Sequence, residues 1–347
     1  MMPLVSVIIP VFNAAKYLEE AFASILNQTW KESLEISIFN DASTDNSTVI
    51  CDHWSQEFFK SGISVLISHN KTGKPCGVGF AKNQAIRQSN GKYLCFFDAD
   101  DVMLPQRIEM QLKIAKTDET AIIGSCYTRI PESSTQRYTI WSNTLSQEQL
   151  YTQVYTSFGP TLINPTWFCS RKVFDVSGMF CEIQDGFPED LEFYYRHLEC
   201  NGKLIKIEIP LLIYRYHQSS ASFNVHENTI WNLRVKQLQK HVLSAWTSFT
   251  IWNAGKQGRK FYKSLTKENR CKVVAMCDVD KKKIDKGFYN CDRFKNEECH
   301  SRIPIIHFSN AIPPFIICVK LNLSNGSFEE NLKSLNLTEG IDYYHFN

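Results

Sequence analysis

The first 130 residues alternate between short apolar runs and amphipathic stretches, and this alternation restricts the fold more than any other feature. The apolar runs include "VSVIIP" and "LEISIFND". Between these two runs, Leu18, Phe22 and Ile25 recur at the spacing of one helical face. Strands separated by single helices are typical of a parallel, doubly wound α/β sheet with right-handed crossovers. Nucleotides often bind such sheets, although the fold class alone does not determine the function.

One of the apolar runs ends in an acidic cluster. In "LCFFDADD" three carboxylates, those of Asp98, Asp100 and Asp101, follow Phe97. A continuous apolar run indicates a strand that is buried on both faces, so the acidic residues would lie at its carboxyl end. Ligands bind at that end of open α/β sheets, and clustered carboxylates suit a Mg²⁺ or Mn²⁺ that carries a substrate phosphate. The alternative is an acidic turn in which Asp101 caps a helix.

Further polar residues follow the other expected strands. Asn13 comes after the first strand and Asp41 ends the second. Because the carboxyl ends of parallel strands meet at one edge, we expect both residues to lie near Asp98 and Asp100. A nucleotide-sugar requires such a set: one carboxylate for a nucleobase N–H, one for the ribose and one for the metal on the diphosphate. The metal would stabilise the charge that develops on the departing nucleoside diphosphate.

An ordered series of motifs resembles the amino-terminal half of inverting family 2-type GT-A glycosyltransferases. The motifs are "VSVIIPVFNAAKYLEEAFASILNQT", "FNDASTDNS", "GFAKNQAI" and "FFDADDVMLPQR", and the resemblance covers about residues 4–220. It implies a GT-A fold in which Asp41 contacts uracil and Asp98 the ribose. It also implies that Asp100, together with Asp98, holds the metal. Lys82 stands where many family members carry Arg, and we expect it to contact the donor phosphates.

The motif "GFPEDLEFYYR" provides a candidate catalytic base. An inverting transfer is a single displacement, so one carboxylate must take a proton from the acceptor hydroxyl as it attacks. The family resemblance assigns this role to Asp190, with Glu189 beside it. The alternative is that both acids merely begin a helix after Pro188, where the helix dipole favours negative charge.

Two further segments hold candidate site residues. "LLIYRYHQSSAS" contains Arg215 and His217 after an expected strand. The resemblance places a histidine here near the metal and diphosphate, and a basic neighbour would favour a departing anion. A surface histidine is the alternative. Trp141 and Trp167 are candidate surfaces for stacking on an acceptor, although large aromatic residues are more often part of the core.

The last hundred residues predict a second α/β unit. "SFTIWNAGKQGRKFYKSL" followed by "KVVAMCDVD" indicates a strand, a glycine turn, a helix and a second strand that ends in acids. This is the outline of a Rossmann half, but Asn253 occupies the first of the three usual glycine positions. We therefore expect a Rossmann-like domain that has lost its nucleotide. The predicted organisation is a catalytic domain over 1–225, a helical connector over 226–250 and this domain over 251–347.

Charge is distributed unevenly between these parts. Residues 1–250 hold 22 Lys and Arg against 25 acids, a net charge of −3, whereas residues 251–347 hold 16 against 11, a net charge of +5. The excess is densest in 255–286, where 11 basic residues accompany 4 acidic ones. Such a patch suits a nucleic-acid backbone, although most charge runs are solvated faces.

The sequence also predicts a cytoplasmic protein without a membrane segment. We find no apolar run of membrane-spanning length, and the first strand begins within a few residues of Met1, which leaves no room for a signal peptide. The 12 cysteines are consistent with that compartment if they stay reduced.

The resemblance extends through most of the chain to glycosyltransferases that act on queuosine in tRNA, and it includes "NAGKQGRKFYKSL" and "FIICVKLNL". It implies transfer of galactose from UDP-galactose, with Mn²⁺ or Mg²⁺, to a hydroxyl of queuosine at the wobble position of tRNA for tyrosine. The basic domain would contact the anticodon arm. Two alternatives stay open. One is a soluble UDP-GlcNAc-dependent transferase with a glycan, lipid or protein acceptor, and the other is a non-catalytic module that binds tRNA or a nucleotide-sugar.

Overall fold

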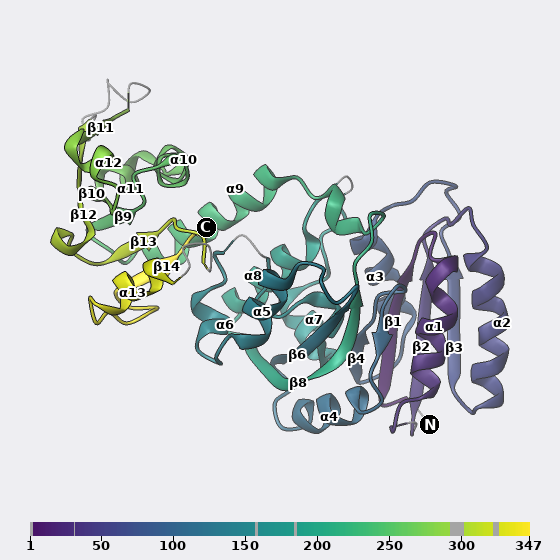
Figure 1. Cartoon of the computed structure of the whole chain (residues 1–347). Coiled ribbons are helices and arrows are strands. Elements are labelled where there is room, and N and C mark those ends of the chain that lie inside the picture. The colour runs from purple at the N-terminus through teal and green to yellow at the C-terminus, as the bar shows by residue number, and fades with distance from the viewer. Residues whose placement is uncertain (1–2, 31, 157–158, 184–185, 292–301, 322–325) are drawn as a thin grey trace. The chain divides into compact units, whose positions relative to one another are not determined.

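A computed structural model describes residues 3–30, 32–156, 159–183, 186–291, 302–321 and 326–347. The chain divides into two compact units, each with its own sheet (Figure 1). The first unit comprises Met1–Leu150 and Pro160–His226, and the second comprises Tyr151–Gly159 and Glu227–Asn347. Among the described residues, no helix has both the length and the apolar character needed to cross a membrane.

The first unit is built from an eight-stranded sheet and its covering helices. The strands are β1 (Val5–Val11), β2 (Leu34–Asn40), β3 (Ser64–His69), β4 (Tyr93–Phe96), β5 (Val102–Met103), β6 (Ala121–Ile130), β7 (Phe168–Ser170) and β8 (Lys203–Arg215). The helices are α1 (Ala15–Leu26), α2 (Ser47–Lys60), α3 (Val78–Gln88), α4 (Arg107–Ala115), α5 (Gln136–Thr144), α7 (Lys172–Ser177) and α8 (Glu189–Glu199). The short helix α6 (Gln149–Thr152) begins in the first unit and ends in the second.

The sheet of the first unit has the strand order β3-β2-β1-β4-β7-β6-β8-β5. The expected parallel arrangement is correct for β3, β2, β1 and β4. Beyond β4 the sheet is mixed, because β7 runs antiparallel to both β4 and β6, and β5 runs antiparallel to β8. With three and two residues, β7 and β5 are too short to show a periodic pattern in the sequence.

Strand β2 is buried on both faces, which explains its continuous apolar run. Ile36 and Ile38 lie in one core cluster with residues of α1 and α2, including Phe58. On the opposite face, the Ser37 hydroxyl donates to the carbonyl oxygen of Ala85 in α3. Successive side chains of a strand point to opposite faces, so helices on both sides bury every residue of β2. Figure 1 shows α1 and α2 next to one another.

A buried carboxylate aligns the amino ends of the central strands. Glu35 at the start of β2 accepts hydrogen bonds from the Ser6 hydroxyl (2.7 Å) and from the backbone N–H of Asn90 (2.8 Å). The N–H of Gly91 donates to the same Ser6 hydroxyl, and a Cβ at Gly91 would lie 2.5 Å from the backbone nitrogen of Ser6. Only glycine permits this approach, which brings β4 beside β1 with their carboxyl ends together.

The second unit contains a six-stranded sheet in the order β11-β12-β10-β9-β13-β14. Its strands are β9 (Phe249–Trp252), β10 (Val273–Asp278), β11 (Phe288–Asn290), β12 (Arg302–His307), β13 (Phe315–Ile317) and β14 (Tyr343–His345). Its helices are α9 (Glu227–Leu238), α10 (Lys256–Ser264), α11 (Lys267–Cys271), α12 (Lys281–Asp285) and α13 (Ser327–Lys333). All pairs except β11 with β12 are parallel. The predicted Rossmann-like α/β architecture of this region is confirmed.

The cysteines differ in one respect from the expectation. Ten described cysteines are free thiols, but Cys271 is disulfide-bonded. The condition that the cysteines stay reduced is therefore not met at this position. The spacing of cysteines along a chain does not reveal which thiols the fold brings within bonding distance.

Candidate active site

The acidic turn after β4 brings three carboxylates together. Ligand oxygens of Asp98, Asp100 and Asp101 all lie within 4.8 Å of one another. Asp101 is buried, and among the described residues its Oδ2 atom has no hydrogen-bond partner. An unpartnered buried carboxylate oxygen beside two others is the arrangement that a hard divalent cation satisfies. Asp98 and Asp100 were expected as metal ligands, whereas Asp101 was expected only as an alternative helix cap, and the helix begins later, at Arg107.

The end of β8 attaches to this acidic turn. The backbone N–H of Arg215 donates to Asp101 (2.8 Å), and its Nε atom donates to the carbonyl oxygen of Asp100 (2.8 Å). The Nε2 atom of His217 lies 2.7 Å from Oδ2 of Asp100. The ring of Tyr17 stacks on His217 at 4.7 Å. The structure therefore brings both expected residues to the acids, and it adds Tyr17, which the sequence motifs did not single out.

Lys82 forms a buried ion pair with Glu189. Its Nζ atom lies 3.0 Å from the Oε1 atom of Glu189 and also donates to the side-chain oxygen of Asn164. Burial alone would lower the pKa of the Lys82 amine, but Glu189, Asp98 and Asp190 outweigh it, so the pKa is raised. Lys82 therefore carries a permanent positive charge between the acidic turn and the start of α8.

Two carboxyl groups near Lys82 are held in environments that oppose ionisation. Burial and the neighbouring Glu189 carboxylate raise the pKa of Asp190 to about 7, although Lys82 acts in the other direction. Burial likewise raises the pKa of Asp98 to about 6, with Lys82 opposing and Asp100 adding to the shift. A general base is most effective when its pKa lies near the working pH, so Asp190 has the property that proton abstraction requires.

Asp41 lies at the same edge, at the end of β2, and holds a loop of the chain. Its carboxylate accepts hydrogen bonds from the Asn70 amide (2.6 Å) and from the backbone N–H groups of Cys76 and Gly77 (both 2.8 Å). These contacts fix the segment that leads from β3 into α3. The side chain expected to read a nucleobase is thus already engaged with its own backbone, and any contact with a base would use its remaining acceptor positions.

Asn13 joins the first two loops of this edge. Its side-chain oxygen accepts a hydrogen bond from the backbone N–H of Thr44 (2.8 Å), and its own N–H donates to the Ser43 hydroxyl (2.9 Å). Asn13 has a positive φ of 49°, a conformation that asparagine tolerates better than most residues. The residue therefore shapes the loop between β1 and α1 at the expected position.

Both tryptophans considered as acceptor surfaces belong to the core. Trp167 and Trp141 are only 1% and 4% exposed. The indole N–H of Trp167 donates to the carbonyl oxygen of Leu162 (2.8 Å), and its ring packs against Phe180 and Phe193. The interpretation as stacking surfaces is therefore wrong, because neither ring face is open to an acceptor.

Comparisons with known proteins identify the family of this chain. Glycosyl transferase family 2 matches residues 6–178. An uncharacterized glycosyltransferase of Haemophilus influenzae is 30% identical over 65% of this chain and 70% of its own length. The chain belongs to glycosyl transferase family 2. A second relative, an uncharacterized glycosyltransferase of Rickettsia prowazekii, is 28% identical over 77% of this chain and 74% of its own length.

Solved structures share the fold of this family 2 glycosyltransferase. S. aureus TarS in complex with UDP-GlcNAc has 16% sequence identity and a TM-score of 0.51, over 76% of this chain and 71% of that chain. The mannosyltransferase PcManGT from Pyrobaculum calidifontis, in complex with GDP-Man and Mn²⁺, has 17% identity and a TM-score of 0.50, over 71% and 64%. The predicted GT-A fold is confirmed, and the protein is a transferase with a nucleotide-sugar donor.

We expect the variant Asp190→Asn to be more stable than the wild type at about pH 8. In the folded state the pKa of Asp190 is raised to about 7. The free energy of unfolding of the wild type therefore falls as the pH rises from about 3.9 to about 7, where only the unfolded chain is ionised, and it stays lowered above that pH. The gain should shrink as the pH falls through about 7 and vanish below about 3.9, where the carboxyl is protonated in both folded and unfolded chains. Thermal unfolding followed by circular dichroism at several pH values measures this.

Asp45→Asn is the matched control with the opposite sign. Although burial acts against it, hydrogen bonds from Ser47 and Ala15 lower the pKa of Asp45. This variant should therefore lose stability at about pH 8, by less than about 1 kcal/mol, because Asp45 is exposed and the Asn side chain keeps an oxygen acceptor. An Asp190→Asn protein that melts below the wild type at this pH would contradict the assignment of a raised pKa.

Proposed function

We propose that this family 2 glycosyltransferase moves galactose from UDP-galactose to a hydroxyl of queuosine at the wobble position of tRNA for tyrosine, in the cytoplasm. The observation that carries the transferase part of the proposal is the edge of the first sheet, where a three-carboxylate cluster and a carboxyl with a pKa of about 7 occur together. The acceptor and the donor sugar are supported by the sequence resemblance and by the basic surface of the second unit.

The acidic cluster fits a resident Mn²⁺ or Mg²⁺. Asp98, Asp100 and Asp101 provide oxygen ligands, and His217 contacts Asp100 from the side. When bound, the cation neutralises the charge that develops on the diphosphate at the bond being broken. The hydrogen bonds from Arg215 keep the acidic turn in place for this role.

The remaining residues divide between donor and acceptor. Asn13 and Asp41 lie at the ends of β1 and β2, and they would hold the nucleoside part of the donor. Asp190 would take the proton of the acceptor hydroxyl as its oxygen attacks the anomeric carbon. Lys82 and Glu189 act through Asp190, because their ion pair fixes the start of α8.

The second unit offers a basic surface for RNA. Lys256 and Lys263 of α10 and Lys281 and Lys282 of α12 are exposed. The side chain of Lys283 in α12 reaches the start of α10, since a Cβ at Gly255 would lie 3.5 Å from its Nζ atom. Three other basic residues of the expected patch are engaged within the unit instead: Arg259 lies over Tyr289, Lys260 over Trp231, and Lys283 pairs with Asp278.

We expect the purified protein to add one hexose to queuosine-containing tRNA for tyrosine when it is supplied with UDP-galactose and Mn²⁺. Mass spectrometry of the nucleosides measures the product. Asp100→Asn should reduce the rate about 10²- to 10³-fold, since an electrostatic contact at the developing charge is lost. UDP-GlcNAc in a parallel reaction is the control for the donor. Sugar addition from UDP-GlcNAc but not from UDP-galactose would contradict the proposal. A reaction with a glycan acceptor and none with tRNA would also contradict it. Either result would favour the alternative transferase.

We expect Asp190→Asn to lower kcat about 10²- to 10⁴-fold, the contribution of a general base. In the wild type, kcat/KM should fall as the pH drops through about 7, because the base must be deprotonated and its pKa is raised to about 7. Steady-state rates across this range measure both effects. A variant rate within a few-fold of the wild type would remove Asp190 from the role of base.

We expect the double variant Lys281→Ala and Lys282→Ala to weaken tRNA binding and to reduce the slope of log K against log salt by about 2 if both lysines contact phosphates. Fluorescence anisotropy with labelled tRNA at several salt concentrations measures the slope. Lys113→Ala and Lys116→Ala on and after α4 of the first unit form the control pair, for which the slope should not change. If the salt slope is the same for the Lys281 and Lys282 variant as for the control pair, the RNA does not contact these two lysines.

A further inference from the structure

Two aromatic side chains that follow β8 are exposed to solvent. Tyr216 and Phe223 are 38% and 52% exposed, and their rings meet edge to face with 5.5 Å between the centroids. Ile130 at the end of β6 is also exposed, and its carbonyl oxygen accepts a hydrogen bond from the backbone N–H of Tyr216 (2.8 Å). Single exposed apolar residues are common, whereas a group of them beside an active site indicates a surface that another molecule covers.

The segment that carries both rings, residues 216–226, joins two parts of the active site. Near its start, His217 contacts Asp100 of the acidic turn (2.7 Å). Near its end, Asn224 packs against Gly186 in the loop that leads into α8. A Cβ at Gly186 would lie 1.9 Å from the carbonyl oxygen of Asn224, so only glycine permits this approach. The segment therefore runs from the candidate metal ligands to the loop before the candidate base.

This position corresponds to the acceptor side of the reaction. In the proposed transfer, the diphosphate leaves at the acidic turn while Asp190 takes the proton of the acceptor hydroxyl. The acceptor therefore reaches the donor between the acidic turn and the start of α8. Asn13 and Asp41 would hold the nucleoside of the donor at the ends of β1 and β2. Tyr216 and Phe223, on the segment that joins the turn to the loop before α8, are thus placed to contact the acceptor.

The chemistry of the segment suits an unpaired nucleobase. Residues 216–226 have the sequence "YHQSSASFNVH", which includes two histidines and no acidic residue, so it carries no charge that would repel a phosphate backbone. The amide side chains of Gln218 and Asn224 are exposed beside the rings along the chain. Proteins that bind single-stranded RNA stack aromatic side chains on the faces of splayed bases and use polar side chains for the base edges.

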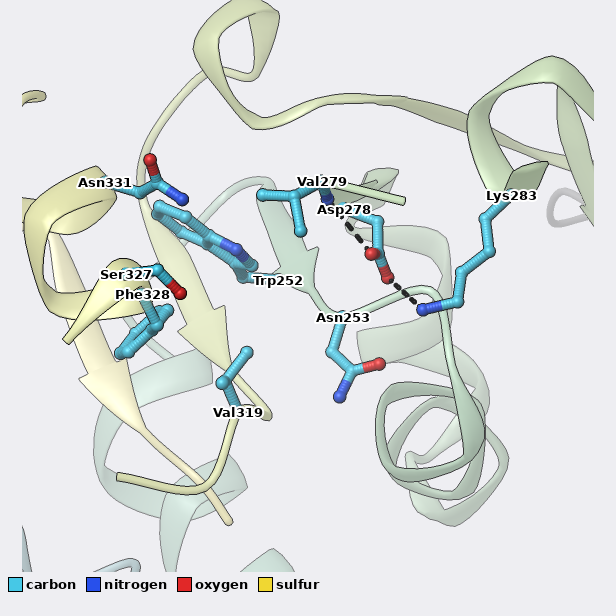
Figure 2. A pocket seen from close by; sticks show the side chains of 9 residues that line it. All are labelled: Trp252, Asn253, Asp278, Val279, Lys283, Val319, Ser327, Phe328 and Asn331. Atoms are coloured by element: carbon cyan, nitrogen blue, oxygen red, sulfur yellow. Dashed lines mark hydrogen bonds and ion pairs between the residues drawn. The ribbon is translucent and has the colours of Figure 1, made fainter. Parts of the chain in front are cut away.

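A pocket in the second unit differs from this surface. It has a volume of about 210 Å³ and lies between α13 and the loops after β9 and β10 (Figure 2). Two of its lining residues are aromatic, but Trp252 and Phe328 are only 2% and 6% exposed. Both pack with Phe308 and Phe315 in the core of that unit. Their rings are therefore engaged within the protein, as the ring of Trp167 is, whereas Tyr216 and Phe223 reach solvent.

We propose, on the basis that the acceptor is RNA as in the function proposed above, that Tyr216 and Phe223 stack on an unpaired nucleobase of the acceptor. The contact would hold the acceptor nucleotide near the acidic turn and Asp190. It takes the role that Trp141 and Trp167 cannot fill, because those rings are buried. Stacking on a base involves no phosphate, so this contribution to binding should not depend on salt in the way that the lysine contacts do.

The test compares two RNA hairpins: the anticodon arm of tRNA for tyrosine, and the same arm with abasic positions throughout its loop. Fluorescence anisotropy with labelled hairpins at one salt concentration measures their binding to the full-length protein and requires no sugar transfer. The wild type should bind the hairpin with bases about 10-fold more tightly than the abasic hairpin, the effect expected for about one stacked base. In the double variant Tyr216→Ala and Phe223→Ala this difference should disappear, and the abasic hairpin should bind as it does to the wild type.

Two further variants serve as controls. Phe59→Ala removes another exposed aromatic residue, on α2, and should keep the difference between the hairpins. Tyr216→Phe combined with Phe223→Tyr keeps both rings and should also keep it.

The outcomes separate this contact from the proposed function. An alanine double variant that retains the difference, or that weakens both hairpins equally, would overturn the stacking contact and leave RNA as the acceptor. A wild type that binds neither hairpin would overturn both the contact and the RNA acceptor. If the difference depends on the two rings but no hexose is transferred to the tRNA, the stacking contact is supported and only the proposed reaction is contradicted.

Discussion

The buried ion pair between Lys82 and Glu189 is the interaction on which the geometry of the active site depends. Lys82 comes from α3 and Glu189 begins α8, so the pair joins α3 to the helix that carries Asp190. Gly79, one turn before Lys82, makes this possible, because a Cβ there would lie 3.3 Å from the Glu189 side chain and 2.3 Å from the carbonyl oxygen of Cys181. Removing one partner of a buried pair typically costs about 3–5 kcal/mol, since the other charge is left without compensation.

Buried carboxyl groups in the same region lower the stability of the folded protein. Burial and the neighbouring acids raise the pKa of Asp101 well above its usual range, and the pKa values of Asp98 and Asp190 are raised as well. Carboxyl groups arranged in this way destabilise the folded state at neutral pH, and such arrangements are typical of sites that must bind a cation or move a proton. The opposite end of the sheet offsets this cost, because Glu35 is fully hydrogen-bonded there and β2 is buried on both faces.

The second unit shows how a partial motif acquires a different meaning in three dimensions. Asn253 has a φ of 124° and stands at the first glycine position of the loop. Its amide is held at both ends, by the N–H of Gly255 and by the carbonyl oxygen of Cys318. The Asn253 side chain therefore occupies one backbone donor of the loop, the N–H of Gly255. What remains open is the neighbouring space under Trp252 and α13.

The sequence by itself determined the local features of this protein. The alternation of strands and helices, the acids at the end of β4 and the acidic start of α8 are visible because periodicity and end positions are local properties of the chain. The tertiary structure alone decided the partners: the mixed part of the sheet, the attachment of Arg215 and His217 to the acidic turn, the pairing of Lys82, and the burial of Trp167. These contacts join residues far apart along the chain, and strand register and packing, which no short stretch encodes, determine which of them meet.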